Sequence, residues 1–399
     1  MRHNKVGAVL IAAQIAVTLA IVCNALFIIE QRLAFSARPS GVSDEADVFV
    51  IENHWEGHPT DLPARVGVDL AALRALPAVV DATVSETYPL GGPITGLGIT
   101  LHPERPRAGT FVAAYFADQH TLHTLGLKLV AGRNFRPDEI TDQVGSGGDS
   151  TKALSGIIVS RALARRLDPS GNVVGRVAVL EPASMTAPII GVVERLQGQT
   201  LARIAAFEGN SMLIPYRLVG PYAFYLVRSR PSQVAAAMQA ARRGLFQISR
   251  ARAIVKIQTL ADARRTAYSS DRGLALALGL VCAALLAVTA WGIVGLTSYW
   301  VTQRRRQIGI RRALGGTRLA IVRYFQIEIF LIAGTGVVVG IGLAIAGNLW
   351  MVSHFALPRL DERYLIVGAA IILLLGQLAV LWPALRAASI PPAEATRTV

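Results

Sequence analysis

The sequence predicts a membrane protein that has four transmembrane α-helices and a large α/β domain inserted between the first and the second helix. Three observations predict this fold class. Only 17% of the 399 residues are charged, whereas soluble domains average about 25%, and the mean hydropathy is +0.45. Four long segments contain no Asp, Glu, Lys or Arg. The segment between the first two alternates short strand and helix patterns.

The first uncharged segment covers residues 6–29 and follows the basic start MRHNK. A cleaved secretory signal is the alternative interpretation of this segment. Secretory signals have an apolar core of roughly 7 to 15 residues, which is followed by a cleavage site of small residues. Here the uncharged run has 24 residues, and no clear A-x-A site follows it. We therefore predict that residues 1–29 form an N-terminal tip and an uncleaved first transmembrane helix.

Three further uncharged segments lie in the C-terminal third of the chain, at residues 273–301, 329–355 and 364–385. Each exceeds the roughly 20 residues that a helix needs to cross a hydrocarbon layer of about 30 Å. In lipid these segments must be helical, because only a helix satisfies its own backbone groups. The predicted helices cover about 273–301, 324–352 and 364–385. Cys23 and Cys282 fall inside predicted spans, so neither belongs to a disulfide framework or a zinc site.

The distribution of charge predicts the orientation. Residues 302–323 carry seven arginines and no acidic residue, whereas residues 30–271 carry 26 basic and 22 acidic residues. Basic residues in short loops stay on the cytoplasmic side, while long segments cross largely regardless of charge. Both termini and residues 302–323 are therefore predicted inside, and residues 30–271 and 356–363 outside. No nucleic-acid partner is expected, because no domain shows a basic face interleaved with aromatic residues.

Residues 30–271 contain eight stretches rich in β-branched and aromatic residues, which predict strands. They are VFVIE (48–52), VVDATVS (79–85), GLGITL (96–101), TFVAAYF (110–116), GIIVS (156–160), APIIGVV (187–193), SMLIPY (211–216) and YAFYLVR (222–228). Two helices are predicted, SRALARRL (160–167) and SQVAAAMQAARRGLF (232–246), with Ser160 and Ser232 as N-caps. TDQVGSGGDSTK (141–152) is predicted to be a surface loop.

The sequence contains no recognisable catalytic, cofactor-binding or metal-binding set. GSGGDSTK (145–152) fails as a phosphate-binding loop, because its Lys is neither preceded by Gly nor followed by Ser or Thr. His54 and His58 lie in a predicted loop without a third metal ligand. His120 and His123 are predicted to lie in a helix, with a surface or packing role. We therefore expect that this protein is not an enzyme and that any ATP is bound by another chain.

The segment RRRQIGIRRALGGTR (304–318) joins two predicted transmembrane helices. Positive-inside anchoring alone explains its arginines, and anionic headgroups attract each by about 1 kcal/mol. Its apolar residues indicate more than anchoring, because helical spacing puts them on roughly one side. They are Ile308, Ile310, Ala313 and Leu314. Gly315 and Gly316 end the predicted helix. Such a helix docks in a groove of a partner protein or lies in the lipid interface, and the residues leave both open.

The third predicted span is rich in glycine. Gly336 and Gly340 have the small-xxx-small spacing that lets helix backbones approach closely in lipid. This spacing predicts a packed helix bundle, within the subunit or across a dimer. Glu328 lies near the inner end of the same span. Intramembrane acids are often functional, but the position of Glu328 near the interface favours a solvated side chain.

Several stretches, taken in order, resemble one family, the MacB/FtsX-type permeases, which are membrane subunits of ABC systems. Those similar to the family's periplasmic core are YFADQHTLHTLGLKLVAGRNF (115–135), IIVSRALARRLDPSGNVVGRVAVL (157–180) and IIGVVERL (189–196). RRRQIGIRRALGGTR resembles the family pattern R-x-x-E-I-G-I-R-R-A-L-G-A, and PALRAASIPPAEATR (383–397) resembles P-A-R-R-A-A followed by P-x-E-A-L-R. The resemblance covers nearly the whole chain. In departure from it, Gln307 replaces the customary Glu, and Leu385 and Ser389 replace two basic residues.

The resemblance implies a periplasmic MacB-like core domain at residues 30–271 and an FtsX-like domain at residues 272–399, which includes a cytoplasmic coupling segment at 302–323. The expected location is the bacterial inner membrane, with several spans, both termini cytoplasmic and the large domain periplasmic. In such permeases a short cytoplasmic helix docks on the ATPase. The residues carried over to this role are Arg304, Arg305, Arg306, Ile308, Gly309, Ile310, Arg311, Arg312, Ala313, Leu314 and Gly315. The helix-packing residues are Gly336 and Gly340.

The function implied by the resemblance is that of a permease subunit. It couples ATP hydrolysis by a separate ATPase to a conformational change of the periplasmic domain, for export or mechanotransmission of envelope or periplasmic cargo. The expected partners are a cytoplasmic ABC ATPase, a second copy or a similar permease, a periplasmic adaptor and the lipid membrane. The chain lacks the nucleotide-binding domain that MacB carries at its N-terminus, so no cofactor is expected on this chain.

The residues leave two alternative functions open. The first is a regulator or scaffold of FtsX type, which controls a periplasmic partner such as a cell-wall hydrolase without transport. The second is a sensor that uses no ATPase.

Overall fold

The computed structural model describes residues 3–57, 60–93, 95–102, 109–144, 154–181, 185–198, 209–315, 317–355 and 359–389. The chain forms two compact units. The helical unit consists of Met1–Ala37 and Ser270–Val399, and the α/β unit consists of Arg38–Ser269. The α/β unit therefore begins at Arg38 rather than at residue 30, because the first helix continues to Ser36.

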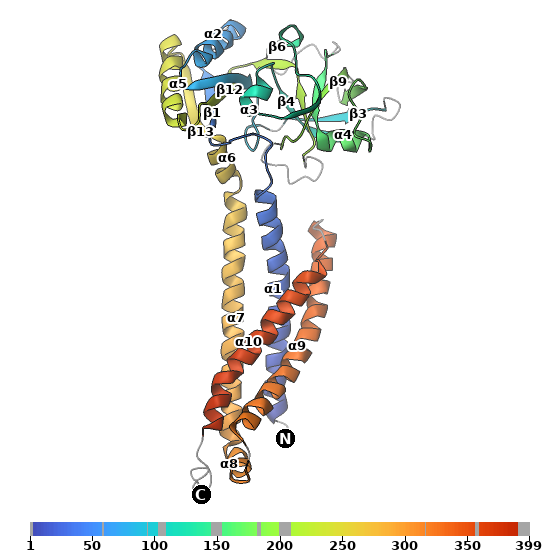
Figure 1. Ribbon diagram of the computed structural model, residues 1–399, viewed down its shortest axis with the longest axis vertical. Coiled ribbons are helices and arrows are strands. Elements are labelled where there is room, and N and C mark those ends of the chain that lie inside the picture. Colours follow the sequence, from blue (N-terminus) through green and yellow to red (C-terminus); the bar gives the residue numbers. More distant parts are fainter. Residues whose placement is uncertain are drawn as a thin grey trace. The chain divides into compact units, whose positions relative to one another are not determined.

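The described part of the helical unit contains four long apolar helices and one short helix (Figure 1). They are α1 (His3–Ser36), α7 (Ser269–Gln303), α8 (Arg305–Ala313), α9 (Arg318–Phe355) and α10 (Glu362–Ala388). Each of the four long helices is long and apolar enough to cross a membrane. Helix α9 begins at Arg318 rather than at residue 324, because the Thr317 hydroxyl accepts a hydrogen bond from the Ala320 amide (3.2 Å) and caps the helix.

Helix α1 packs along α9 and α10, and these two helices pack along each other. The shared core is apolar and contains the fully buried Ile15, Leu19 and Phe325. Large apolar side chains such as Leu331 and Leu374 are exposed on the outside, as expected of residues that face lipid. Because lipid is as apolar as this core, close packing and interhelical hydrogen bonds must hold the helices together.

Two polar contacts, one buried and one partly buried, supply such hydrogen bonds. The hydroxyls of Thr18 in α1 and Thr289 in α7 lie 2.9 Å apart. The Asn24 amide in α1 donates to the Ala344 carbonyl oxygen in α9 (3.1 Å). These contacts fix the rotation of α1 about its own axis relative to α7 and α9. Apolar packing alone specifies that rotation less strongly.

The α/β unit contains a four-stranded antiparallel sheet with the order β13-β1-β12-β2. Its strands are β1 (Val48–Trp55), β2 (Val79–Ser85), β12 (Tyr222–Ser229) and β13 (Arg252–Thr259). Helices α2 (Leu62–Arg74) and α5 (Val234–Ile248) cover one face of this sheet (Figure 1). Successive residues of a strand point to opposite faces. Phe49 and Ile51 therefore pack against α2 and α5, whereas Val48 and Val50 pack on the other face.

A second, seven-stranded sheet has the order β5-β9-β7-β10-β4-β3-β8, and β8 also pairs with β9. This extra pairing closes six of the strands into a ring around an apolar core that includes Ile99, Ile157 and Met212. Its strands are β3 (Gly96–Thr100), β4 (Thr110–Phe116), β5 (Leu129–Gly132), β7 (Ile157–Ser160), β8 (Val177–Glu181), β9 (Met185–Val193) and β10 (Ser211–Ile214). The remaining described elements are α3 (Thr121–Leu125), the 3-10 turn η2 (Pro137–Glu139), β6 (Thr141–Val144), α4 (Arg161–Leu167), β11 (Tyr216–Val219) and α6 (Leu260–Ala267).

The structure confirms all eight predicted strands and the predicted N-cap of α4. The Ser160 hydroxyl accepts a hydrogen bond from the Leu163 amide (3.2 Å). The predicted N-cap of α5 is wrong, because that helix begins at Val234 and Ser232 has a φ of 63°. A backbone in this left-handed region lies outside the extended geometry that a capping serine adopts.

Two predicted loops are also wrong in part. Thr141–Val144 forms strand β6, which pairs in parallel with β11, and the Asp142 carboxylate contacts the Arg217 guanidinium (2.6 Å). His54 lies in β1, where its ring stacks on Tyr222 with 4.2 Å between the ring centroids. His58 and residues 145–152 lie outside the described residues.

Candidate functional site

The predicted coupling segment is attached to α9 through Arg304, and we call this attachment the clamp. Arg304 lies in the turn between α7 and α8, and its guanidinium donates two hydrogen bonds to the Glu328 carboxylate (2.8 and 3.1 Å). It also donates to the Tyr324 hydroxyl (2.8 Å). A bidentate guanidinium–carboxylate pair is stronger than a neutral hydrogen bond and fixes the orientation of both groups. The preference for a solvated Glu328 is therefore wrong, because the side chain is half-buried and paired.

The Arg304 guanidinium of this clamp stays charged at physiological pH. Burial lowers the pKa of the Arg304 guanidinium, but hydrogen bonding and attraction to the Glu328 carboxylate more than offset this and raise that pKa above its usual value. The Arg311 guanidinium lies 5.5 Å from the centre of the Tyr324 ring, within the range of a cation–π contact. Arg304 and Arg311, which lie between α7 and α9, thus both contact the Tyr324 side chain of α9.

Helix α8 buries only a narrow face against the bundle. Ile308 is 7% exposed, whereas Ile310 and Leu314 are 47% and 83% exposed. The prediction that the four apolar residues share one side is therefore wrong, because Ile310 is turned about 200° from Ile308 around the helix. Ile310 and Leu314 are four residues apart, and the Leu314 amide donates to the Ile310 carbonyl oxygen (3.1 Å). Together they form an exposed apolar patch, which we call the α8 ridge.

The other predicted coupling residues surround this ridge. Gly309 is buried with Ile308. The exposed residues are Arg305, Arg306, Arg311 and Ala313. Gly315 follows the helix with a φ of +92°, which favours glycine and is typical of a helix C-terminus. The side chain of Arg312 and the whole of Gly316 lie outside the part of the chain that the structure describes.

A cavity of about 110 Å³ lies between α8 and α9 beside the clamp. It is lined by Arg304, Gln307, Ile308, Arg311, Tyr324 and Phe325, among others. The walls combine guanidinium groups with apolar and aromatic surface. Such a cavity suits one side chain that has an apolar stem and a carboxylate or amide oxygen at its tip.

Helix α9 approaches α1 most closely along its glycines. A Cβ atom at Gly336 would lie 2.7 Å from the Ala12 carbonyl oxygen, and one at Gly340 would lie 2.9 Å from the Ala16 carbonyl oxygen. Both obstacles are backbone atoms, which cannot turn aside as a flexible side chain can. The two glycines therefore let α1 lie directly against α9, within one subunit.

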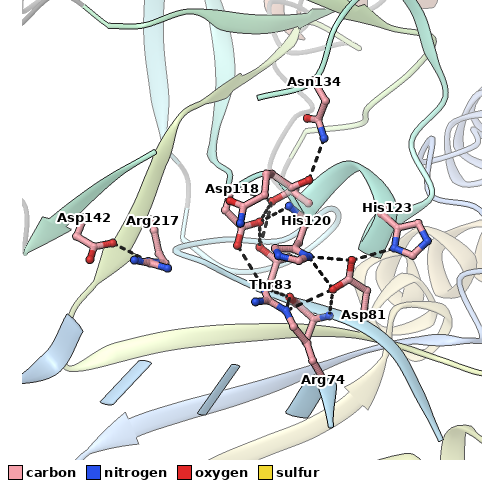
Figure 2. A network of polar contacts seen from close by, with 12 residues as sticks. Arg74, Asp81, Thr83, Asp118, His120, His123, Asn134, Asp142 and Arg217 are labelled. Atoms are coloured by element: carbon pink, nitrogen blue, oxygen red, sulfur yellow. Dashed lines mark hydrogen bonds and ion pairs between the residues drawn. The ribbon is translucent and has the colours of Figure 1, made fainter. Parts of the chain in front are cut away.

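In the α/β unit, the two predicted helical histidines join a polar network between β2 and α3 (Figure 2). Their Nδ1 atoms lie 3.0 Å (His120) and 2.9 Å (His123) from the Asp81 carboxylate. The Arg74 guanidinium lies 3.4 Å from Asp81 and 3.6 Å from the Asp118 carboxylate. The network therefore links α2 and β2 of the four-stranded sheet to α3 and to the end of β4.

This network is held together by the Asp81 carboxylate. Burial raises the pKa of the Asp81 carboxyl, but hydrogen bonds from His123, the Ala82 amide and His120 together bring that pKa below its usual value. Asp81 is therefore ionised at neutral pH. Among the described residues, no group of three or more His, Cys, Asp and Glu side chains could hold a metal ion. The spacing of the two histidines was visible in the sequence, but their carboxylate partner was not.

A second missed feature is a fully buried ion pair between α2 and β13. The Arg252 guanidinium donates two hydrogen bonds to the Asp69 carboxylate (2.8 Å each), and both side chains have no exposed surface. The Tyr225 hydroxyl also donates to Asp69 (2.6 Å). The Arg252 guanidinium lies 4.1 Å from the centre of the Trp55 ring. Burial of both charges is tolerated because each hydrogen-bonding group has a partner.

Two family models match most of the chain. The model described as the MacB-like periplasmic core domain matches residues 11–244. The model described as the FtsX-like permease C-terminal domain matches residues 279–392. The second match contains most of α7 and the whole of α8, α9 and α10.

Curated proteins show the same likeness. The chain is 28% identical to the macrolide export ATP-binding/permease protein MacB of Chromobacterium violaceum, over 68% of this chain and 41% of that protein. It is 32% identical to the uncharacterized ABC transporter permease YknZ of Bacillus subtilis, over 30% of each chain. The chain thus spans less than half the length of these relatives. The crystal structure of the periplasmic region of MacB from Actinobacillus actinomycetemcomitans matches at 13% identity and a TM-score of 0.35, over 57% of this chain and 94% of that one.

Proposed function

Because the chain belongs to the MacB/FtsX-like family of ABC transporter permeases, we propose that it couples ATP hydrolysis by a separate ATPase to a conformational change of its periplasmic domain. Members of this family are membrane proteins with a periplasmic domain, and the family implies an ATPase partner and dimerisation in general. The cargo of this protein is an envelope or periplasmic molecule, which is exported or acted on by mechanotransmission. The helical unit lies in the bacterial inner membrane, with both termini and α8 in the cytoplasm.

The observation that carries this proposal is the exposed α8 ridge. Ile310 and Leu314 project from a short helix whose opposite side is fixed to the bundle through Ile308. A helix that presents apolar residues four apart is suited to a hydrophobic groove of a partner protein. The cavity beside α8 supports the same assignment, because it can receive an acidic or amide side chain of that partner next to Arg304 and Arg311.

The clamp gives the docked helix a connection to the membrane. The bidentate contact between Arg304 and Glu328 couples any movement of α8 to a movement of the first turns of α9. Helix α9 in turn lies on α1 through Gly336 and Gly340. Helix α1 leads directly into the periplasmic unit, which begins at Arg38. A movement imposed on α8 by ATP binding is therefore passed to the segment that enters the periplasm.

The experiment that tests this function is recovery of the cognate ATPase with the tagged permease. Replacing residues 304–316 by a Gly/Ser linker of equal length removes the clamp, the ridge and the helix together. We expect the pull-down to recover no ATPase above the background of an untagged strain. Carbonate extraction of membranes serves as the control, because the variant must remain an integral membrane protein. Recovery equal to that of the unmodified chain would contradict the proposal.

A further inference from the structure

A second cavity at the α8 end of the helical unit is not explained by ATPase docking. It has a volume of about 270 Å³ and lies where the last turns of α7, the first residue of α8 and the last turns of α10 meet. Its walls are Ser298, Val301, Thr302, Arg305, Pro383 and Arg386. The cavity thus brings two guanidinium groups and two hydroxyl groups from three helices to one place.

In the described part of the chain, nothing compensates the positive charge of this cavity. Among the described residues, no carboxylate lies within ion-pair distance of Arg305 or Arg386, although other arginines of the helical unit are paired. Arg32 contacts Asp271, and Arg304 contacts Glu328. Two unpaired guanidinium groups at one cavity repel each other and attract an anion. Phosphate is the group whose oxygens match guanidinium donors best, with hydroxyl donors as additional partners.

The surroundings of the cavity indicate that this anion is part of a lipid. The Arg386 guanidinium lies 5.6 Å from the centre of the Trp382 ring, and Trp382 is 60% exposed. Leu385, next to Arg386, is 54% exposed. Exposed tryptophan beside arginine at the end of an apolar span is typical of the level of lipid headgroups. Basic pockets between transmembrane helices at that level are suited to anionic headgroups.

We propose that this cavity binds the phosphate group of an anionic phospholipid, with Arg305 and Arg386 as the charged partners and Ser298 and Thr302 as hydroxyl donors. A zwitterionic headgroup is disfavoured, because its ammonium group would lie close to two guanidinium groups. The bound lipid bridges α7, α8 and α10, and so it steadies the position of α8. This role of Arg305 differs from the ATPase contact that the sequence implied for it, and it depends only on the placement of the helical unit in a membrane.

The test is native mass spectrometry of the purified full-length chain in detergent, with phosphatidylglycerol, phosphatidylcholine or inorganic phosphate added at equal concentrations. We expect phosphatidylglycerol to bind at least about tenfold more tightly than phosphatidylcholine. Loss of two basic residues near a membrane surface costs about 2 kcal/mol, which corresponds to about 30-fold in affinity. The variant Arg305→Gln/Arg386→Gln should therefore lose phosphatidylglycerol binding by about that factor, and Arg305→Lys/Arg386→Lys should lose less.

The matched control is Arg318→Gln/Arg323→Gln, which removes two exposed arginines of α9 that do not line the cavity. Binding in this control should stay within about twofold of the unmodified chain, and an unchanged melting temperature of each variant checks that the fold is kept. Equal losses in the two glutamine variants would show a general surface charge effect and overturn the proposal. Inorganic phosphate that binds as tightly as phosphatidylglycerol would indicate a free-anion site and overturn the lipid assignment. Loss of ATPase recovery with unchanged lipid binding would assign the cavity to the partner protein instead.

Discussion

Replacing Ile310 and Leu314 together by aspartate is expected to lower the affinity of the permease for its ATPase by about 100-fold or more. Each of these side chains contributes roughly 1.5–3 kcal/mol when it passes from water into an apolar groove, and two of them account for at least about 3 kcal/mol, or about 100-fold. Aspartate also brings an unpaired charge into the groove, which adds to the cost. The measurement is the dissociation constant between the purified permease in nanodiscs and the ATPase.

Two control variants isolate the ridge from its surroundings. Ile310→Val/Leu314→Met keeps the surface apolar and should change the dissociation constant by less than about threefold. Leu319→Asp adds a charge at another exposed apolar residue, which is 71% exposed at the start of α9, and it should leave most of the affinity intact. An Ile310→Asp/Leu314→Asp variant that binds as tightly as the Leu319→Asp variant would show that the α8 ridge does not carry the docking.

The Asp69→Ala variant is expected to destabilise the periplasmic unit by about 3–5 kcal/mol. Removal of one partner of a buried ion pair leaves the other charge buried without compensation, and this loss is far larger than the net contribution of the pair. Here the remaining charge is Arg252, which has no exposed surface. The Tyr225 hydroxyl loses its acceptor as well. Hydrogen exchange of the full-length chain measures the effect locally, because the amides of β1 and β12 exchange only when this sheet opens.

The expected readout is an acceleration of exchange in β1 and β12 by about 10²- to 5 × 10³-fold, which corresponds to this range of free energy. The control is Asp61→Ala, which breaks an exposed pair with Arg65 (2.7 Å) at the start of the same helix. Exposed pairs contribute about 0–1 kcal/mol, so exchange should change by less than about fivefold. The double variant Asp69→Leu/Arg252→Met should recover much of the loss, because it leaves no unpaired charge. Equal exchange in Asp69→Ala and Asp61→Ala would refute this account of the pair.

The elements that the sequence predicted correctly are those whose pattern is strong and local. Four uncharged segments are long enough to cross a membrane, and each lies within one long helix of the structure. The eight predicted strands are rich in β-branched residues, and most residues of these strands are buried in the sheets. Strand β13 escaped prediction since it is an edge strand that carries Lys256 and Gln258 and exposes Val255. Its pairing with β1 decides its structure, and the local sequence does not reveal that pairing.

The polar contacts of the candidate site could not be predicted, because they join residues that are distant in sequence. Arg304 and Glu328 lie in different elements, so the sequence showed a basic cluster and an isolated acid but not a clamp. The ion pair of Asp69 and Arg252 likewise joins a helix near the start of the domain's sequence to a strand near its end. The mistaken apolar face of α8 has a simpler cause. Ile308 and Ile310 alternate as in a strand, and helical geometry separates them by about 200°.

The cytoplasmic location of α8 can be tested through the accessibility of two single cysteines predicted to lie on opposite sides of the membrane. The native Cys23 and Cys282 are both buried, so Leu314→Cys on α8 and Val255→Cys on the α/β unit can be compared in the same chain. A membrane-impermeant maleimide is added to spheroplasts before and after permeabilisation of the inner membrane. We expect that Val255→Cys is labelled in intact spheroplasts and that Leu314→Cys is labelled only after permeabilisation. Labelling of Leu314→Cys in intact spheroplasts at the rate of Val255→Cys would place α8 outside the cell, where no ATPase can dock, and would contradict the account.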